Sequence, residues 1–223
     1  MNINNWHKRN NKRIYILLLV VLVIAGTQLG CSRTAKKIVF KDHLSETVLT
    51  VDGENLTLAD MAFYVIYQED KVEKQAAIYD SSDTTKYWKS HVNGRFLVNI
   101  AKEAVVQMAV RDVIYSRQAE SVGITLTAAE LEQLQERVDE FYDVLTTEQK
   151  EAVGVDKITI AATMHKAALA EKVASGLAIM NGVSPNAYGT EGAAYQQELA
   201  QHTYTLNETL WGGVNLGYIS IIR

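Results

Sequence analysis

Few residues of this chain have the type and spacing that chemistry at a site requires. The five histidines lie far apart in the sequence, at His7, His43, His91, His165 and His202. His165 and Glu171 are six residues apart, whereas metal ligands on one face of a helix lie three or four residues apart. No serine lies in a Gly-x-Ser-x-Gly motif, and no glycine-rich stretch has the spacing and lysine of a phosphate-binding loop. The sequence therefore predicts no catalytic residue, no metal site and no cofactor.

A group of acidic residues is the strongest remaining candidate for a site. A general acid/base pair or a cation site could be built from such a group, but no partner motif accompanies it. We favour a solvated helix face, formed by Glu130, Glu132, Glu136, Asp139, Glu140 and Asp143.

The single cysteine, Cys31, follows a segment that has the layout of an export signal. The first residues include Lys8, Arg9, Lys12 and Arg13 and no acidic residue, and residues 14–26 carry no charge. A basic part, an apolar part and then small residues make up such a signal. The apolar part is shorter than the ~20 residues that span a bilayer. Residues 1–30 are therefore predicted to be a signal peptide.

The Gly30-Cys31 pair resembles the lipobox of bacterial lipoproteins, although Gln28 and Leu29 differ from the usual residues of that motif. The resemblance implies that Cys31 receives the lipid and becomes the mature N-terminus. The stretch that follows is short and basic, and residues 31–46 are interpreted as a tether to the membrane. Two other interpretations stay open: an uncleaved membrane anchor over residues 14–29, and an ordinary secretory signal with an incidental cysteine. All three place the rest of the chain on the extracytoplasmic side of the bacterial cell membrane.

The composition of the remaining chain excludes one class of partner. Residues 1–30 hold four basic and no acidic residues, so their removal changes the formal net charge from −4 to −8. Nucleic-acid binding needs clustered Lys and Arg on the protein, so we expect no nucleic-acid partner. The single proline, Pro185, favours long uninterrupted helices before it.

Apolar spacing and capping residues predict a mainly α-helical domain over residues 47–184. Asp52-Gly53 between β-forming residues predicts a short hairpin before the first helix. Thr127 and Glu130 have the spacing of a capping box. The apolar stripe that follows this cap is predicted to be buried over Leu131, Leu134, Val138, Phe141 and Leu145. The helices are expected at about 58–79, 86–122, 128–145, 147–152 and 158–180.

The tail, residues 185–223, differs in amino-acid composition from the helical domain. It is rich in glycine, and a helix is expected only at about 193–201. Its last run, "LGYISIIR", is β-prone and is predicted to be a strand that needs a partner edge. The tail is interpreted as irregular, either a remnant of a further domain or a segment that binds a partner.

Aromatic residues gather in the first helical region. Tyrosine and tryptophan offer contact area with little conformational entropy to lose, which suits peptide binding as well as core packing. One interpretation places the cluster in the core. The other places part of it in a groove for apolar client segments, contacted by Phe63, Tyr64, Tyr67, Tyr87 and Trp88.

Two stretches resemble a known family. "VDGENLTLADMAFYV" is similar to the strand, turn and helix that open the chaperone module of SurA/PrsA-type extracytoplasmic foldases. "AVRDVIYSRQAESVGITLTAAELEQL" resembles that family's helix junction, with the matching positions Ala119, Gly123, Ile124, Leu126, Thr127, Glu130 and Leu131. The resemblance covers about residues 48–180. It implies a helical module that cradles newly exported chains, often joined to a parvulin prolyl isomerase domain that the residues after Pro185 are too few to form.

The hypothesis from the sequence is a lipid-anchored extracytoplasmic chaperone that binds unfolded or newly exported polypeptides and is not an enzyme. Two alternatives stay open. One is a prolyl isomerase with an unrecognised site. The other is a non-catalytic adaptor lipoprotein that pairs with a partner through its terminal strand. The sequence does not indicate the oligomeric state.

Overall fold

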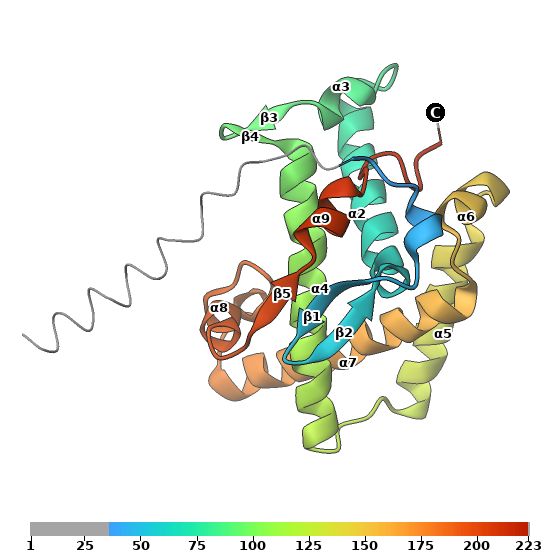
Figure 1. The fold of residues 1–223 in the computed structure, drawn as a ribbon. Helices are drawn as coiled ribbons and strands as arrows, with labels where there is room; N and C mark the ends of the chain where they lie inside the picture. The colour runs from blue at the N-terminus through green and yellow to red at the C-terminus, as the bar shows by residue number, and fades with distance from the viewer. Residues whose placement is uncertain (1–35, 223) are drawn as a thin grey trace, which may run out of the picture. The chain divides into compact units, whose positions relative to one another are not determined.

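The computed structural model of the chain describes residues 36–222, so the predicted signal peptide and Cys31 lie outside the described residues. Lys36–Arg223 form one compact unit. As predicted, this unit is mainly helical and carries a small antiparallel sheet (Figure 1). Among the described residues, no helix combines the length and apolar character needed to cross a membrane.

Three long helices form the centre of the unit. They are α2 (Leu58–Tyr79), α4 (Leu97–Ser121) and α7 (Lys157–Asn181). Each packs against the other two, and α5 (Ala128–Asp143) packs against α7 (Figure 1). The short α6 (Thr147–Val153) connects α5 to α7. Because the apolar faces of these helices meet, the core is one continuous cluster of buried side chains.

Local capping chemistry explains where the helices begin. Thr57 and Asp60 form a capping box at the start of α2, and Thr127 and Glu130 form the predicted one at the start of α5. Gly154 ends α6 with a φ of 76°, a left-handed conformation that suits glycine.

The predicted bounds of α2 are confirmed. The predicted buried stripe of α5 holds at Leu134 and Val138, but Leu131 is 44% exposed.

The long helix predicted over residues 86–122 was wrong in its first part. This stretch forms α3 (Thr85–Trp88) and a two-stranded hairpin, β3 (His91–Val92) and β4 (Arg95–Phe96), before α4 begins. Asn93 and Gly94 have φ values of 51° and 78°. Both central residues of a type I′ hairpin turn need a positive φ, and Asn-Gly is its favoured pair. The turn chemistry therefore prevails over the helical spacing.

The second sheet joins distant parts of the chain. β1 (Thr47–Val51) and β2 (Glu54–Thr57) form the predicted hairpin around Asp52 and Gly53, which both have a positive φ. β5 (Tyr204–Leu206), from the tail, pairs antiparallel with the other side of β1. The sheet order is β2–β1–β5. This pairing was not predicted.

The predicted terminal strand was also wrong. Residues 216–220 form turns and bends, residues 221 and 222 have no regular secondary structure, and the strand of the tail lies upstream at β5. The tail also forms η2 (Pro185–Tyr188), α8 (Ala193–Leu199) and α9 (Glu208–Gly213). Its apolar side chains, among them Tyr195, Trp211, Leu216 and Ile219, are buried in the same core as those of the helices.

Candidate functional site

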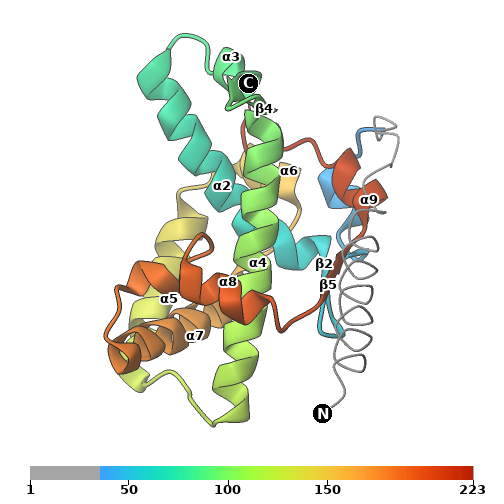
Figure 2. The ribbon, with the colours of Figure 1, turned by 90° about the vertical axis from the view of Figure 1, so that its left-hand side faces the viewer.

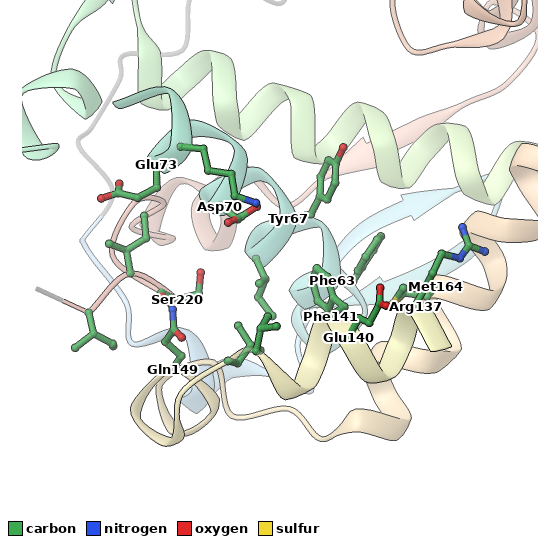
Figure 3. A pocket seen from close by; sticks show the side chains of 16 residues that line it. Phe63, Tyr67, Asp70, Glu73, Arg137, Glu140, Phe141, Gln149, Met164 and Ser220 are labelled. Atoms are coloured by element: carbon green, nitrogen blue, oxygen red, sulfur yellow. Dashed lines mark hydrogen bonds and ion pairs between the residues drawn. The ribbon is translucent and has the colours of Figure 1, made fainter. Parts of the chain in front are cut away.

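An apolar groove of about 890 Å³ lies between α2, the end of α5, α7 and the last described residues (Figure 3). Helix α2 contributes Phe63, Ile66 and Tyr67 to its lining. The remaining apolar lining residues are Phe141, Val144, Leu145, Met164, Ile221 and Ile222. Concave apolar surfaces of this size are where proteins bind apolar ligands and segments.

Aromatic contacts define the floor of the groove. Phe63 and Tyr67 lie one helical turn apart on α2, with ring centroids 6.1 Å apart. Phe141 of α5 approaches Phe63 with a centroid distance of 5.1 Å (Figure 3). Tyr67 remains 45% exposed, so its ring is available to a ligand while Phe63 is held by its neighbours. The helix spacing of α2 thus presents two adjacent aromatic rings to the groove.

Charged side chains surround this apolar floor. Asp70, Glu73, Lys74, Arg137 and Glu140 all line the groove. Lys74 and Asp70 form an exposed ion pair with an N···O distance of 2.7 Å. Exposed pairs contribute little to stability, so these charges mainly keep the rim hydrated around an apolar centre.

The buried carboxylate of Glu69 holds the wall formed by the end of the chain. Its Oε1 accepts hydrogen bonds from the backbone N–H groups of Gly217 (2.5 Å) and Ile219 (3.1 Å). Its Oε2 accepts from the backbone N–H and the hydroxyl of Ser220, both at 2.6 Å. Burial raises the pKa of Glu69 above its ordinary value, against the opposing effect of these donors.

Two further contacts fix the same segment. The side-chain amide of Gln149 donates to the Ser220 carbonyl at 2.6 Å. Gly217 packs closely against the indole of Trp88, because a Cβ atom at this position would come within 2.8 Å of the ring. The backbone N–H groups of Gly217, Ile219 and Ser220 are already bonded to Glu69. They are therefore not free to pair with another chain, as the predicted terminal strand would require.

The five predicted contact residues are divided between groove and core. Phe63 and Tyr67 line the groove. Tyr64 is buried and donates its hydroxyl to the buried carboxylate of Asp112 at 3.2 Å. Trp88 is buried and donates its indole N–H to Glu73 at 2.8 Å. Tyr87 packs beside Tyr79, with ring centroids 5.7 Å apart, and does not line the groove.

Several lining residues were not recognised as site residues from the sequence. Phe141 and Leu145 belong to the apolar stripe predicted for α5. The spacing of that stripe predicts burial, but it does not predict that its last residues line a groove. Ile221 and Ile222 had only the signal of an apolar run, which was read as a strand. Their place beside α2 depends on Glu69, a buried acid that no local pattern distinguishes from a surface one.

The acidic face of α5 is solvated and ion-paired. Lys157 contacts Asp139 at 2.7 Å and Asp143 at 3.1 Å, and Lys172 contacts Glu130 at 2.6 Å. The hydrogen bond from Lys172, with that from the Thr127 backbone, lowers the pKa of Glu130 to about 2. Within residues 36–222, no three His, Cys, Asp or Glu side chains are grouped so that they could hold a metal ion.

Comparison with known proteins finds a distant relative of the chain. The chain is similar to the foldase protein PrsA of Caldanaerobacter subterraneus subsp. tengcongensis. The two sequences are 26% identical over 144 residues, which is 64% of this chain and 44% of the relative. The match therefore spans less than half of the relative's length. No protein-family model matches the chain, and no solved structure matches it.

Proposed function

We propose that this protein is a chaperone that binds unfolded, newly exported polypeptides in the groove between α2 and α5. The observation that carries the proposal is the solvent-accessible aromatic floor of Phe63, Tyr67 and Phe141. The similarity to a protein named a foldase supports the same role. Unfolded chains differ from folded ones in exposing apolar side chains, and these are what such a floor buries.

The proposed mechanism is reversible masking of apolar surface. Burying one large apolar side chain contributes roughly 1.5–3 kcal/mol, and part of this is offset by ordering the client. Contacts with a few client side chains therefore give weak binding that holds a chain and then releases it. A client held in this way is removed from the pool that aggregates.

The location of this activity is proposed from the sequence. The signal peptide and the lipid on Cys31 would fix the protein to the extracytoplasmic face of the membrane, where exported chains emerge unfolded. A lipid anchor with more than one acyl chain holds firmly, because each buried methylene adds ~0.8 kcal/mol. Prolyl isomerisation stays the alternative, and a proline-limited refolding reaction separates an isomerase from a holder.

An aggregation assay tests the proposal. A reduced, unfolded client is diluted into buffer with the purified full-length chain, and light scattering follows its aggregation. We expect the chain in stoichiometric amounts to delay the rise in scattering. An unchanged aggregation curve would contradict the proposal.

A further inference from the structure

Within residues 36–222, β5 is an edge strand, because it pairs with β1 on one side only. The backbone N–H of Asp52 donates to the Thr203 carbonyl at 2.9 Å. At the other end of the pairing, the backbone N–H of Asn207 donates to the Val48 carbonyl at 2.8 Å. Residues 203 and 207 therefore direct their backbone groups toward β1.

The residues between them alternate in direction. Bonding groups in a strand point to opposite sides at successive residues, so Thr205 also faces β1, opposite Thr50. Tyr204 and Leu206 direct their N–H and C=O groups to the other side, where no described segment forms a strand. This open edge lies to the left of β1 in Figure 1 and faces the viewer in Figure 2.

A cleft of about 750 Å³ lies against these same two residues. Its other walls include Val106 and Gln107 of α4 and Trp211 of α9. The side-chain amide of Gln107 donates to the hydroxyl of Tyr204 at 3.3 Å, while its Oε1 is buried and has no hydrogen-bond partner among the described residues. The hydrogen bond from Gln107 therefore ties the side chain of Tyr204 to α4.

The wall opposite α4 is held in place. The ammonium group of Lys102 donates to the carbonyls of Trp211 (2.5 Å), Gly212 (3.2 Å) and Val214 (3.0 Å). These bonds satisfy the carbonyls at the end of α9 and fix the helix against α4. The cleft is therefore formed before any ligand arrives, which lowers the entropy lost on binding.

We propose that this cleft binds an extended segment of unfolded polypeptide, which adds as a further strand to the open edge of β5. The proposal rests on the proposed chaperone function and adds a second contact for the same client. Tyr204 and Leu206 offer paired donors and acceptors at two-residue spacing, which only an extended backbone matches. Recognition through the main chain accepts many sequences, as a holder of varied exported chains requires.

The walls of the cleft favour a single chain over a second folded copy. β5 is three residues long and lies beside α4 and α9. A single strand can enter between such walls. A second sheet would bring its own flanking helices against them.

A pair of variants at one position tests this proposal in the full-length chain. Leu206→Pro removes an N–H that faces away from β1, a place where an edge strand tolerates proline. Leu206→Ala removes the same side chain and keeps the N–H. Binding is measured by fluorescence anisotropy with a short labelled peptide rich in Val and Thr, which favour the extended conformation. We expect about tenfold weaker binding for Leu206→Pro and a change within about threefold for Leu206→Ala. Equal affinities for two folded variants would overturn the proposal.

Chemically modified peptides provide the second arm, which needs no variant of the protein. The peptide is compared with the same sequence N-methylated at every central residue, so that no shift in register restores its amides. We expect the N-methylated peptide to lose its binding to the unaltered chain, because its backbone no longer donates to β5. Equal binding of both peptides would overturn strand addition. A dimer in light scattering that the peptide does not dissociate would also overturn it, in favour of a second copy. Neither result would affect the groove, whose own variants are read in the aggregation assay.

Discussion

Glu69 and Ser220, 151 residues apart in the sequence, are joined by two hydrogen bonds of 2.6 Å, one from the backbone and one from the hydroxyl of the serine. The carboxylate is buried, so these bonds form where water cannot replace them. They place the end of the described chain against α2. The apolar wall at Ile221 and Ile222 follows from this placement.

Replacing the carboxylate of Glu69 is predicted to release this wall. In Glu69→Gln, an amide N–H₂ group faces backbone donors that previously met an oxygen, so at least one buried donor loses its partner. We expect a loss of about 3 kcal/mol of unfolding free energy, measured by urea denaturation. Asp70→Asn, the same change on the next and exposed residue, is expected to cost less than about 0.5 kcal/mol. Equal losses in the two variants would contradict this account of the tail.

A pH dependence is predicted at Asp112. Burial raises the pKa of this carboxyl to about 6, and the Arg111 guanidinium at 3.0 Å opposes the shift. The folded chain therefore binds this proton more tightly than the unfolded chain. The resulting stabilisation is complete below the unfolded pKa near 4 and is lost as the pH rises through about 6.

Asp112→Asn isolates this contribution. The stability of the unaltered chain minus that of Asp112→Asn is expected to fall between pH 4 and pH 7, by up to about 3 kcal/mol. Chemical denaturation at several pH values measures the difference. Thr125→Ala, which changes an exposed side chain that carries no titratable group, serves as the control and should lack this trend. A difference that rises with pH would contradict the predicted direction.

The capping box of α5 gives a prediction about stability alone. Thr127→Ala removes the hydroxyl that accepts from the Glu130 backbone N–H, and the expected cost is about 1 kcal/mol. Thr125→Ala, two residues earlier, removes an exposed hydroxyl outside the box and should cost much less. Thermal melting compares the two variants. The prediction fails if both melt at the same temperature.

Much of the helical part was predictable because its signals are local. The Thr127–Glu130 cap and the apolar spacing of α2 act within a few residues, and both were read correctly. The Asn93-Gly94 turn is equally local, and it interrupts a helical spacing that continues on both sides of it. The sequence therefore holds two competing local signals here, and the turn prevails because Asn-Gly suits the positive φ of both turn residues.

The arrangement of the tail was not predictable in the same way. β5 pairs with a strand some 150 residues earlier, and apolar spacing does not specify which edge a short strand joins. Only some of the residues that line the groove were predicted, because the others reach it through contacts between distant parts of the chain. The prediction that Phe63 and Tyr67 belong to a groove agrees with the structure. Tyr64 and Trp88 were predicted in the same way but are buried, because Tyr64 contacts Asp112 and Trp88 contacts Gly217.

The lipid anchor is a prediction from the sequence that an experiment on cells can test. In Cys31→Ser, the sulfur that would carry the diacylglyceryl group is missing. We expect labelled fatty acid to be absent from this variant and the protein to leave the membrane fraction. Ser32→Ala should keep both properties. A variant that stays in the membrane fraction would instead favour the uncleaved anchor.

The central claim, that the groove binds unfolded polypeptide, is tested most directly by two matched double variants in the aggregation assay. Tyr67→Glu with Val144→Glu places charge in the groove, at side chains that are 45% and 75% exposed. Tyr79→Glu with Val122→Glu makes the same changes outside it, at side chains that are 74% and 66% exposed. Val144 and Val122 both cap the C-terminal end of a helix, so the effect on the helix dipole is shared. We predict that the groove variant loses most of the delay in aggregation and the control keeps it. Equal protection by the two folded variants would contradict the claim.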